Sequence, residues 1–306
     1  MKVLVTGGSG FLGSHLVPAL IAQGNEVTSK RFDVRDSEAC RNAVAGHDVV
    51  YHLAAKVAVK RSERKTAHEV NVKGTENMVQ AALAANVKRF LHVSTVATVG
   101  LNSDQSILNE NSHHDFADRK FPNFDSKIES EKVVLRAVAE RNLDAVIVNP
   151  AMIFGAGDAK KAARKGNILA ARGKLPFYTV GGLSIVAVED VVQGMIEAMK
   201  HGRKGERYIL SGENLTFEQV FHLYAKLAGV KPPKRAISTG VLRKIGAAIE
   251  TLKLNSELSP ESALAATSYH WFDHAKATRE LNFHPLPAAF AIENSFRYMQ
   301  ENGYLK

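Results

Sequence analysis

Apolar runs and amphipathic stretches alternate through the first half of the chain. Five apolar runs have the length and composition of strands. They are Lys2–Thr6, Glu26–Ser29, Asp48–Leu53, Arg89–Ser94 and Asp144–Asn149. Apolar residues at helical spacing predict helices at Gly10–Gln23, Thr66–Asn86 and Asn123–Arg141. This alternation predicts an α/β fold, a doubly wound parallel sheet of Rossmann type with helices on both faces.

The pattern is unusually short after the second strand. Only a few residues separate Ser29 from the stretch Asp33-Val34-Arg35-Asp36. A parallel crossover needs about a dozen residues and usually contains a helix. We therefore predict that the helix that normally follows the second strand is missing, and that the third strand is vestigial or absent.

The alternation weakens beyond Pro150. Further strands are predicted at Ser184–Val188 and Arg207–Leu210. The predicted helices are Ala159–Ala171, Asp190–Lys200 with Asp190 as its cap, one opened by the capping box Thr216-x-x-Gln219, and Pro287–Asn302. We expect residues 1–150, with returning segments near 183–210, to form a large unit. Residues 151–182 and 211–306 then form a smaller one.

Composition supports an ordinary globular protein. The chain has 306 residues, of which 45% are hydrophobic, enough for about two structural units. Its single cysteine, Cys40, excludes an intrachain disulfide and fits a reducing compartment. No apolar run approaches the ~20 residues that span a bilayer, and the first residues lack the pattern of a signal peptide. We therefore expect a cytoplasmic protein without a membrane span.

The formal net charge is +9. Basic residues concentrate in two clusters, Lys56, Lys60, Arg61, Arg64 and Lys65, and Lys160, Lys161, Arg164 and Lys165. We interpret both as solvated helix and loop faces, with attraction of an anionic ligand such as a pyrophosphate as the alternative. Neither cluster has the interleaved aromatic residues of a single-strand-binding platform, so we expect no nucleic-acid partner.

A glycine-rich turn joins the first strand to the first helix. It reads Thr6-Gly7-Gly8-Ser9-Gly10-Phe11-Leu12-Gly13. Gly7 permits a tight turn, Gly10 lets backbone N–H groups approach a pyrophosphate, and Gly13 lets the helix lie close to the sheet. Because the motif lies between a predicted strand and a predicted helix, it indicates a dinucleotide site. A structural turn without a ligand is the alternative.

With this spacing the chain resembles the extended short-chain dehydrogenases/reductases, the NAD(P)-dependent epimerase/dehydratase family. Other family motifs follow in order. They are Asp33-Val34, His52-Leu53-Ala54-Ala55, Asn71-Val72-Lys73-Gly74-Thr75, Val93-Ser94-Thr95, Pro150 to Gly155 with Phe154 in place of Tyr, and Trp271-Phe272-Asp273 to Phe283. The tail resembles dihydroflavonol-reductase-like and sugar-epimerase-like members. The shortened region after the second strand is more like dTDP-4-dehydrorhamnose reductase.

The resemblance implies the residues that contact a nicotinamide dinucleotide. They are Gly7, Ser9, Gly10, Phe11, Leu12, Gly13, Lys30, Arg31, Asp33, Val34, Leu53, Ala54, Ala55, Asn71, Lys127 and Pro150. It also implies that the large unit binds the dinucleotide and that the smaller unit binds substrate. No metal ligands are implied. In the family, the helices here at Thr66–Asn86 and Asn123–Arg141 form a homodimer surface, although their apolar faces are equally compatible with the core.

The residues after the second strand bear on the choice of dinucleotide. NAD-binding members usually place an acidic residue there to bind the ribose 2′-hydroxyl, whereas Arg accommodates the 2′-phosphate of NADP. The position reads Ser29-Lys30-Arg31, with no acid before Asp33. We favour NADP over NAD because the Arg guanidinium matches phosphate geometry. The alternative is that both basic side chains simply face water.

The catalytic positions implied by the family contain one departure. A hydroxyl that holds the substrate oxygen falls on Thr95, and the Lys that binds the nicotinamide ribose falls on Lys127. The proton-transferring Tyr, four residues before that Lys, is replaced by Asn123, and no Tyr lies between Tyr51 and Tyr178. An amide has no proton to transfer near neutral pH. This removes a general acid whose contribution is typically about 10²–10⁴-fold.

Candidate replacement acids lie upstream, at His113, His114, Asp115 and Asp118. Three functions remain open. The first is an active oxidoreductase that transfers hydride from NADPH to a small carbonyl or sugar-derived substrate. The second is a redox-silent NADP-binding protein with a structural or regulatory role, and the third is a nucleotide-sugar epimerase or dehydratase. In the family an Arg precedes the proline that corresponds to Pro150. Here that position is Asn149, which weakens the hypothesis of a nucleotide-sugar epimerase or dehydratase. Phe154, Phe177 and Tyr178 line either a substrate pocket or the core.

Overall fold

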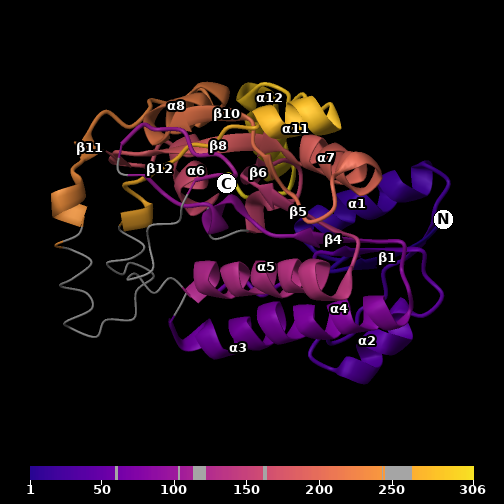
Figure 1. Cartoon of the computed structure of the whole chain (residues 1–306). Helices are drawn as coiled ribbons and strands as arrows, with labels where there is room; N and C mark the ends of the chain where they lie inside the picture. The colour runs from indigo at the N-terminus through magenta and orange to yellow at the C-terminus, as the bar shows by residue number, and fades with distance from the viewer. Residues whose placement is uncertain (59–60, 103, 113–121, 161–163, 243, 245–263) are drawn as a thin grey trace.

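A six-stranded parallel sheet forms the centre of the molecule (Figure 1). The computed structural model describes residues 1–58, 61–102, 104–112, 122–160, 164–242, 244 and 264–306. The strand order is β2-β1-β3-β4-β5-β9. These strands are β1 (Lys2–Thr6), β2 (Glu26–Thr28), β3 (Val49–His52), β4 (Arg89–Val93), β5 (Ala145–Pro150) and β9 (Arg207–Leu210). The predicted Rossmann-type fold is confirmed.

Helices cover both faces of this sheet, as Figure 1 shows. On one side Val3 and Val5 join a core with residues of α1 (Phe11–Ala22) and α7 (Val188–His201). On the other side Leu4 joins a core with residues of α2 (Ser37–Val44), α4 (Gly74–Ala84) and α5 (Pro122–Arg141). Burial on both faces explains why the strand sequences are almost continuously apolar.

The region after β2 has the predicted shortening. Among the described strands β2 pairs with β1 alone, so no third strand extends this edge. The predicted absence of a helix after the second strand is wrong, because α2 follows β2 and leads to β3 on the other side of β1. The helix begins at Ser37, beyond the short stretch from Ser29 to Asp36 on which the prediction was based. Asp36 caps α2 by accepting the N–H groups of Glu38 and Ala39, a signal that was present in the sequence.

The predicted helix Thr66–Asn86 is divided into three helical segments. They are α3 (Arg64–His68), a π-helical segment at Glu69–Lys73, and α4. Segments of π-helix are rare and often lie at functional sites. This one contains Asn71, whose contacts are described below.

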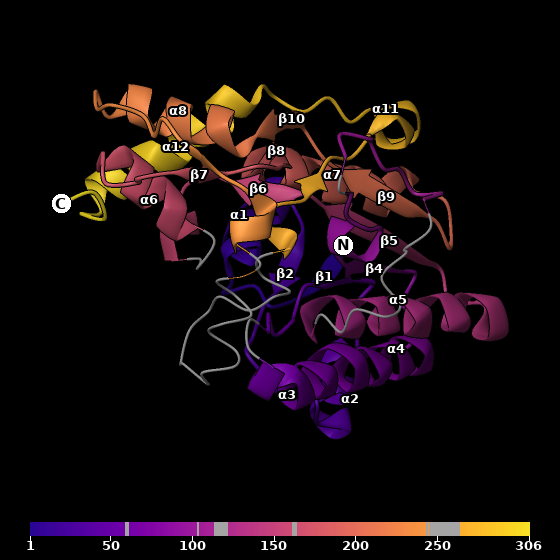
Figure 2. The same cartoon turned by 90° about the vertical axis from the view of Figure 1, so that its left-hand side faces the viewer.

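A second sheet follows β5. Its central strand β8 (Gly182–Ala187) pairs antiparallel with β10 (Glu213–Thr216), and its other edge pairs with β6 (Met152–Phe154) and β12 (Tyr269–His270). Around it lie α6 (Lys165–Ala171), α8 (Phe217–Leu227) and α12 (Ala288–Glu301), as Figure 2 shows. Residues 183–210 therefore divide between the sheets, because β8 belongs to the second sheet while α7 and β9 belong to the first.

The remaining elements are short. A two-stranded parallel ladder joins β7 (Tyr178–Thr179) to β11 (Ala236–Ile237), and α11 (Ala275–Leu281) packs against α7 and β9. Phe154 is fully buried in the core of the second sheet, whereas Phe177 is exposed and Tyr178 is half-buried. The structure therefore places Phe154 in the core.

One predicted cap is wrong and one is confirmed. Helix α7 begins at Val188 with Ala187 as its N-cap, and Asp190 lies inside its first turn. The Asp190 carboxylate accepts the backbone N–H of Leu286 instead. The helix starts early because β8 ends at Ala187 and leads directly into it. By contrast, Thr216 and Gln219 form the predicted capping box of α8.

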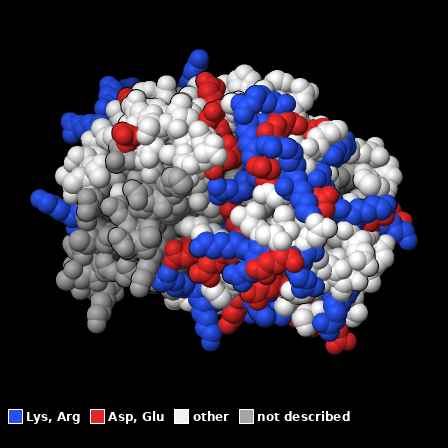
Figure 3. Space-filling model, in the orientation of Figure 1, with Lys and Arg blue, Asp and Glu red and all other residues white. Residues whose placement is uncertain are grey.

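The charges are dispersed over the described surface. Figure 3 shows Lys and Arg alternating with Asp and Glu on the face it draws. Arg164 departs from the predicted solvated face, because it is buried in an ion pair with Asp158 and lies over the Phe154 ring. The core of the second sheet encloses this pair, which Ser295 also contacts through a hydrogen bond to Asp158.

Candidate functional site

The glycine turn follows β1 and leads into α1. Gly7 has φ +70°, and a Cβ on it would lie 2.9 Å from the Ala54 nitrogen. A Cβ on Gly13 would lie 2.4 Å from the Gly7 oxygen. The N-cap of α1 is Gly10, so no side chain caps the helix. Backbone N–H groups therefore remain available to an anion at this end of the helix.

The remaining residues of the turn differ in exposure. Ser9 is exposed, while Phe11 and Leu12 are half-buried. Gly7 and Gly10 are exposed as well, so the turn is open to solvent.

The chain that leaves β2 passes close to the turn. A Cβ on Gly8 would lie 2.7 Å from the Ser29 Cβ, so the glycine permits this approach. Lys30 and Arg31 follow, and both are exposed. No ion-pair or hydrogen-bond partner for either lies within the described residues. The structure thus places two unpaired cations beside the turn.

Asp33 and Val34 lie farther along the same segment. The exposed Asp33 forms an ion pair with Arg35, which lowers the pKa of its carboxyl to about 2. Val34 is buried against Gly74 at the start of α4, where a Cβ would lie 2.5 Å from Val34 Cγ2. Asn77 of α4 donates hydrogen bonds to the carbonyl oxygens of Val34 and Arg35. The segment is therefore held in place from α4.

The end of β3 is bonded to the end of β1. Thr6 Oγ1 accepts the N–H groups of Leu53 and Ala54, each at 3.1 Å. Its own proton is left for His52 Nδ1 at 2.8 Å, so His52 Nε2 carries the proton toward Thr75 Oγ1. Burial lowers the pKa of His52 to about 3, with a smaller effect of Lys127. The neutral His52 holds the Thr6 hydroxyl, and Thr6 in turn fixes the backbone of Leu53 and Ala54 beside Gly7. The next residue, Ala55, is exposed.

Asn71 connects the loop after β3 to α5. Its Oδ1 accepts the Lys56 N–H at 2.8 Å, and its Nδ2 donates to the Lys56 carbonyl and to Ser126 Oγ. The side chain is fully buried. Its polar atoms are thus occupied within the protein. Asn71 therefore contributes to the site by fixing the backbone of Lys56.

Lys127 lies in the second turn of α5 and points toward the end of β4. Its side chain is buried, and Nζ donates a hydrogen bond of 2.7 Å to the Val93 carbonyl oxygen. Burial lowers the pKa of Lys127 to about 8, and the carboxylate of Glu131 acts in the opposite direction. Burial likewise lowers the pKa of the neighbouring His92, whose Nε2 pairs with Ser130.

Thr95 follows β4 two residues after Val93 and is half-buried. Its Oγ1 accepts the Ala97 N–H, and its carbonyl oxygen accepts Asn149 Nδ2 at 3.1 Å. Asn149 and the buried Pro150 close β5, the next strand of the sheet. Thr95, Lys127 and Pro150 are therefore grouped at the carboxyl ends of β4 and β5.

The position implied for the missing tyrosine begins α5. The backbone of Asn123 lies in the first turn of this helix, four residues before Lys127. Its side chain lies outside the described residues. The candidate acids His113, His114, Asp115 and Asp118 also lie outside them.

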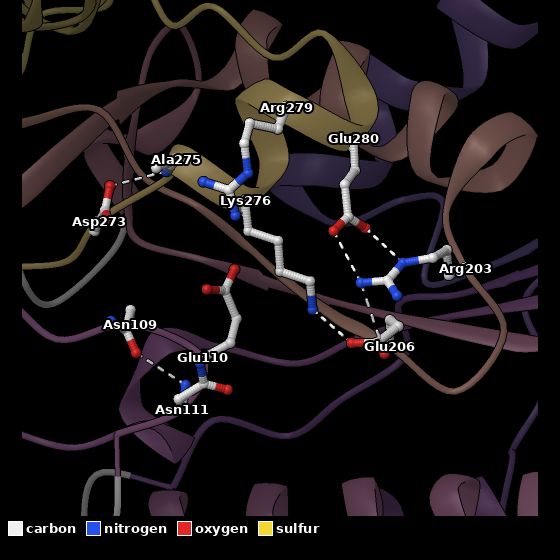
Figure 4. Close-up of a pocket in the computed structure, with 10 residues that line it drawn as sticks. All are labelled: Asn109, Glu110, Asn111, Arg203, Glu206, Asp273, Ala275, Lys276, Arg279 and Glu280. Carbon is white, nitrogen blue, oxygen red and sulfur yellow. Dashed lines mark hydrogen bonds and ion pairs between the residues drawn. The ribbon is translucent and has the colours of Figure 1, made fainter.

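A separate cavity of about 420 Å³ lies beside the outer edge of β9 (Figure 4). Its charged side chains mostly pair with one another: Arg203 with Glu280, and Lys276 with Glu206. Arg203 and Glu206 precede β9, whereas the glycine turn follows β1. The cavity is therefore at a different place in the sheet from the turn.

A nicotinamide dinucleotide fits the grouped residues. The uncapped helix and the closely packed glycines suit a pyrophosphate, and Lys30 and Arg31 add positive charge. Residues 3–211 match the NAD dependent epimerase/dehydratase family. The chain belongs to this family. By class it is a nicotinamide-dependent oxidoreductase.

No described helix has the length and apolar character to cross a membrane.

Curated relatives of this family match the whole chain or nearly so. Sterol demethylase protein B of Methylococcus capsulatus is 30% identical and covers 100% of both chains. A candidate dihydroflavonol 4-reductase of Synechocystis sp. is 27% identical and covers 99% of this chain and 95% of its own. The 3-beta-hydroxysteroid dehydrogenase of Mycolicibacterium neoaurum is 28% identical, and the match covers 93% of this chain and 87% of the relative.

Solved structures of the same fold agree. The crystal structure of gox2253 has a TM-score of 0.88 and 29% identity over 100% of this chain and 99% of its own. DesIV of Streptomyces venezuelae, solved with NAD and TYD bound, has a TM-score of 0.77 and 22% identity over 99% and 98%. RMD of Pseudomonas aeruginosa, complexed with NADPH, has a TM-score of 0.75 and 18% identity over 100% of each chain. Epimerase/dehydratase-type folds thus include structures solved with either dinucleotide.

Several residues of the site were not predicted from sequence. Thr6, His52 and Thr75 hold the ends of β1 and β3, and Asn77 holds the segment after β2. Asn149 bonds the Thr95 carbonyl and Glu131, and Arg207 pairs with Glu131. Thr6, His52 and Thr75 lie within the family motifs and Glu131 lies four residues after Lys127, so these positions had a sequence signal. The other contacts join elements that are far apart in sequence.

Proposed function

We propose that this protein reduces a small carbonyl substrate with NADPH. The observation that carries the proposal is Lys127, which is buried at the end of β4 and grouped with Thr95 and Pro150. A bound nicotinamide supplies or accepts the hydride. The glycine turn binds the pyrophosphate, and Lys30 and Arg31 bind the 2′-phosphate of NADP in preference to the free hydroxyl of NAD. Lys127 holds the nicotinamide ribose, and Thr95 holds the substrate oxygen.

Proton delivery is the step in which this chain departs from its family. Asn123 positions the substrate oxygen as a hydrogen-bond donor, and the proton comes from another group or from water. The elements around the second sheet bind the substrate, while residues 1–150 with α7 and β9 bind the dinucleotide. Relatives described as acting on sterols, steroids and dihydroflavonols favour an alicyclic carbonyl compound over a nucleotide sugar.

We also propose a cytoplasmic location and a homodimer. The only cysteine, Cys40, is a buried free thiol, in keeping with a reducing compartment. Helices α4 and α5 pack side by side on one face of the sheet, where a second copy can extend the bundle. Light scattering coupled to size exclusion tests the dimer.

Titration with NADPH and with NADH, by calorimetry, tests the cofactor assignment. We expect NADPH to bind more tightly. A screen of cyclic and aliphatic ketones then tests turnover in both wild-type protein and Asn123→Tyr. A rate gain in Asn123→Tyr shows that proton delivery limits the natural protein.

The second candidate function is a redox-silent NADP-binding protein, which the absence of the tyrosine favours. Tight NADPH binding without turnover in either protein supports it. Loss of activity in His113→Ala or His114→Ala, with no gain in Asn123→Tyr, identifies a replacement acid instead.

A further inference from the structure

A buried carboxylate lies one helical turn after Lys127 on α5. This residue is Glu131, which is 4% exposed. Its Oε1 accepts hydrogen bonds from Thr98 Oγ1 and from Asn149 Nδ2, both at 2.7 Å. Its Oε2 lies 3.4 Å from Arg207 Nη1 of β9. Burying a charge is costly without such partners, so this carboxylate is held in one place by three elements.

The same partners extend to Thr95. Asn149 Nδ2 lies 3.1 Å from the Thr95 carbonyl oxygen and 2.7 Å from Glu131 Oε1. Thr98 Oγ1 lies 2.8 Å from the Thr95 carbonyl oxygen as well, but its single proton is donated to Glu131 in this arrangement. Glu131 therefore reaches the Thr95 backbone through Asn149, whose two amide protons serve both acceptors. A hydroxyl that must hold a substrate oxygen depends on such anchoring, because small displacements lower the rate steeply.

Glu131 also acts on Lys127, since its carboxylate raises the pKa that burial lowers. Within the described part of the chain, the other titratable groups that act on Lys127 are His52 and His92, which burial keeps neutral. On α5 itself, Asp125 pairs with Arg64, and Glu129 pairs with His68 at the surface. The carboxylate of Glu131 therefore offsets part of the cost of burying the ammonium.

We propose that Glu131 is a positioning residue for carbonyl reduction, which anchors Thr95 through Asn149 and stabilises the ammonium of Lys127. Arg207 provides the cationic partner of Glu131, since position 149 is a neutral Asn. This inference rests on the proposed function for its catalytic part. Its electrostatic part is a property of the protein without ligands.

The test compares Glu131→Gln with wild type. The amide retains an oxygen for Thr98 and Asn149 but loses the charge. NMR titration of lysine side chains, with Lys127 assigned through Lys127→Met, should show Lys127 losing its proton about one pH unit lower in Glu131→Gln. The upper pH limit of kcat/KM for the carbonyl substrate should move down equally. Glu131→Ala, which also removes the anchor, should lower kcat about 10²-fold with little change in NADPH affinity.

Glu129→Gln is the matched control, because Glu129 lies on the same helix but at the surface. It should leave both the NMR titration of Lys127 and the upper pH limit of kcat/KM unchanged. Equal Lys127 titration in wild type and Glu131→Gln overturns the inference, whatever the activity. If Glu131→Gln shifts the titration but wild type reduces no carbonyl, the electrostatic role stands and the proposed function fails. Thermal unfolding of each variant identifies those that do not fold, and for these Glu131→Asp takes the place of Glu131→Ala.

Discussion

The glycine turn and the surroundings of Glu131 are built in opposite ways. The turn consists of backbone, and its residues are adjacent in sequence and partly exposed. The Glu131 group consists of buried and half-buried side chains from α5, β5, β9 and the segment after β4, which bond one another. The helix end at the turn has no side-chain cap, whereas both carboxylate oxygens of Glu131 have partners within the protein. The turn is therefore built from local sequence, and the Glu131 group is built from long-range contacts.

This difference has a consequence for mutation. At Gly7 and Gly13, an added Cβ meets backbone atoms at 3.0 Å or less. In the Glu131 group, removal of an atom leaves a buried partner unsatisfied.

The largest effect is expected for Gly13→Ala. The new Cβ would lie 2.4 Å from the Gly7 oxygen and 2.6 Å from the Gly8 Cα, so the turn or α1 must shift. We expect NADPH affinity to fall at least about 100-fold and the free energy of unfolding to fall by about 1–3 kcal/mol. Calorimetry and urea unfolding measure both. Gly240→Ala, where nothing lies within 4 Å of the new Cβ, is the control. Unchanged NADPH affinity in Gly13→Ala would argue against the turn as the pyrophosphate site.

Asn71→Ala should have the next largest effect, because Asn71 connects the loop after β3 to α5. The substitution leaves the Lys56 N–H without its buried acceptor and removes the link to Ser126. We expect a loss of about 1–3 kcal/mol in the free energy of unfolding, measured in urea. Asn109→Ala, at an exposed position, should cost much less. A loss no greater than that of the control would show that the bridge contributes little.

Substitution of Lys30 and Arg31 together by Ala should discriminate between the dinucleotides. Each cation is exposed and unpaired among the described residues, so the protein loses no internal contact. We expect NADPH affinity to fall about tenfold, the effect of losing about 1.4 kcal/mol, while NADH affinity stays the same. Lys88→Ala, at a distant surface ion pair, serves as the control. An equal loss for both dinucleotides would exclude a 2′-phosphate contact.

The smallest effect concerns the two buried histidines, one in each region. Burial lowers the pKa of His52 to about 3 and that of His92 as well, so the folded state holds both neutral. Below the ordinary histidine pKa the unfolded chain binds more protons than the folded one, so stability falls as pH falls. We expect each histidine to lower the free energy of unfolding by about 1 kcal/mol for each pH unit below pH 6. His92→Leu should flatten the decline measured by urea unfolding between pH 5 and 7.

If His92→Leu leaves the pH dependence of stability as in wild type, the buried histidine takes no part in the acid sensitivity.

Local sequence determined much of this protein. The glycine turn, the strands β1 and β9, the capping box of α8 and the absence, among the described strands, of a third strand beyond β2 were all predicted from neighbouring residues. Each depends on chain geometry within a few residues, such as the room for a Cβ or the length of a connection. The positions of Lys127 and Asn123 on one helix followed from their spacing for the same reason.

Tertiary structure alone decided the rest. The burial of Arg164 with Asp158, the start of α7 at Val188, the role of Asn71 as a bridge and the partners of Glu131 could not be inferred from local patterns. Each depends on which distant segment lies opposite, and a charged or amide side chain has the same local signature whether it faces water or a buried partner. Burial makes the choice, because removing water gives a hydrogen bond or an ion pair its large influence on position and on pKa.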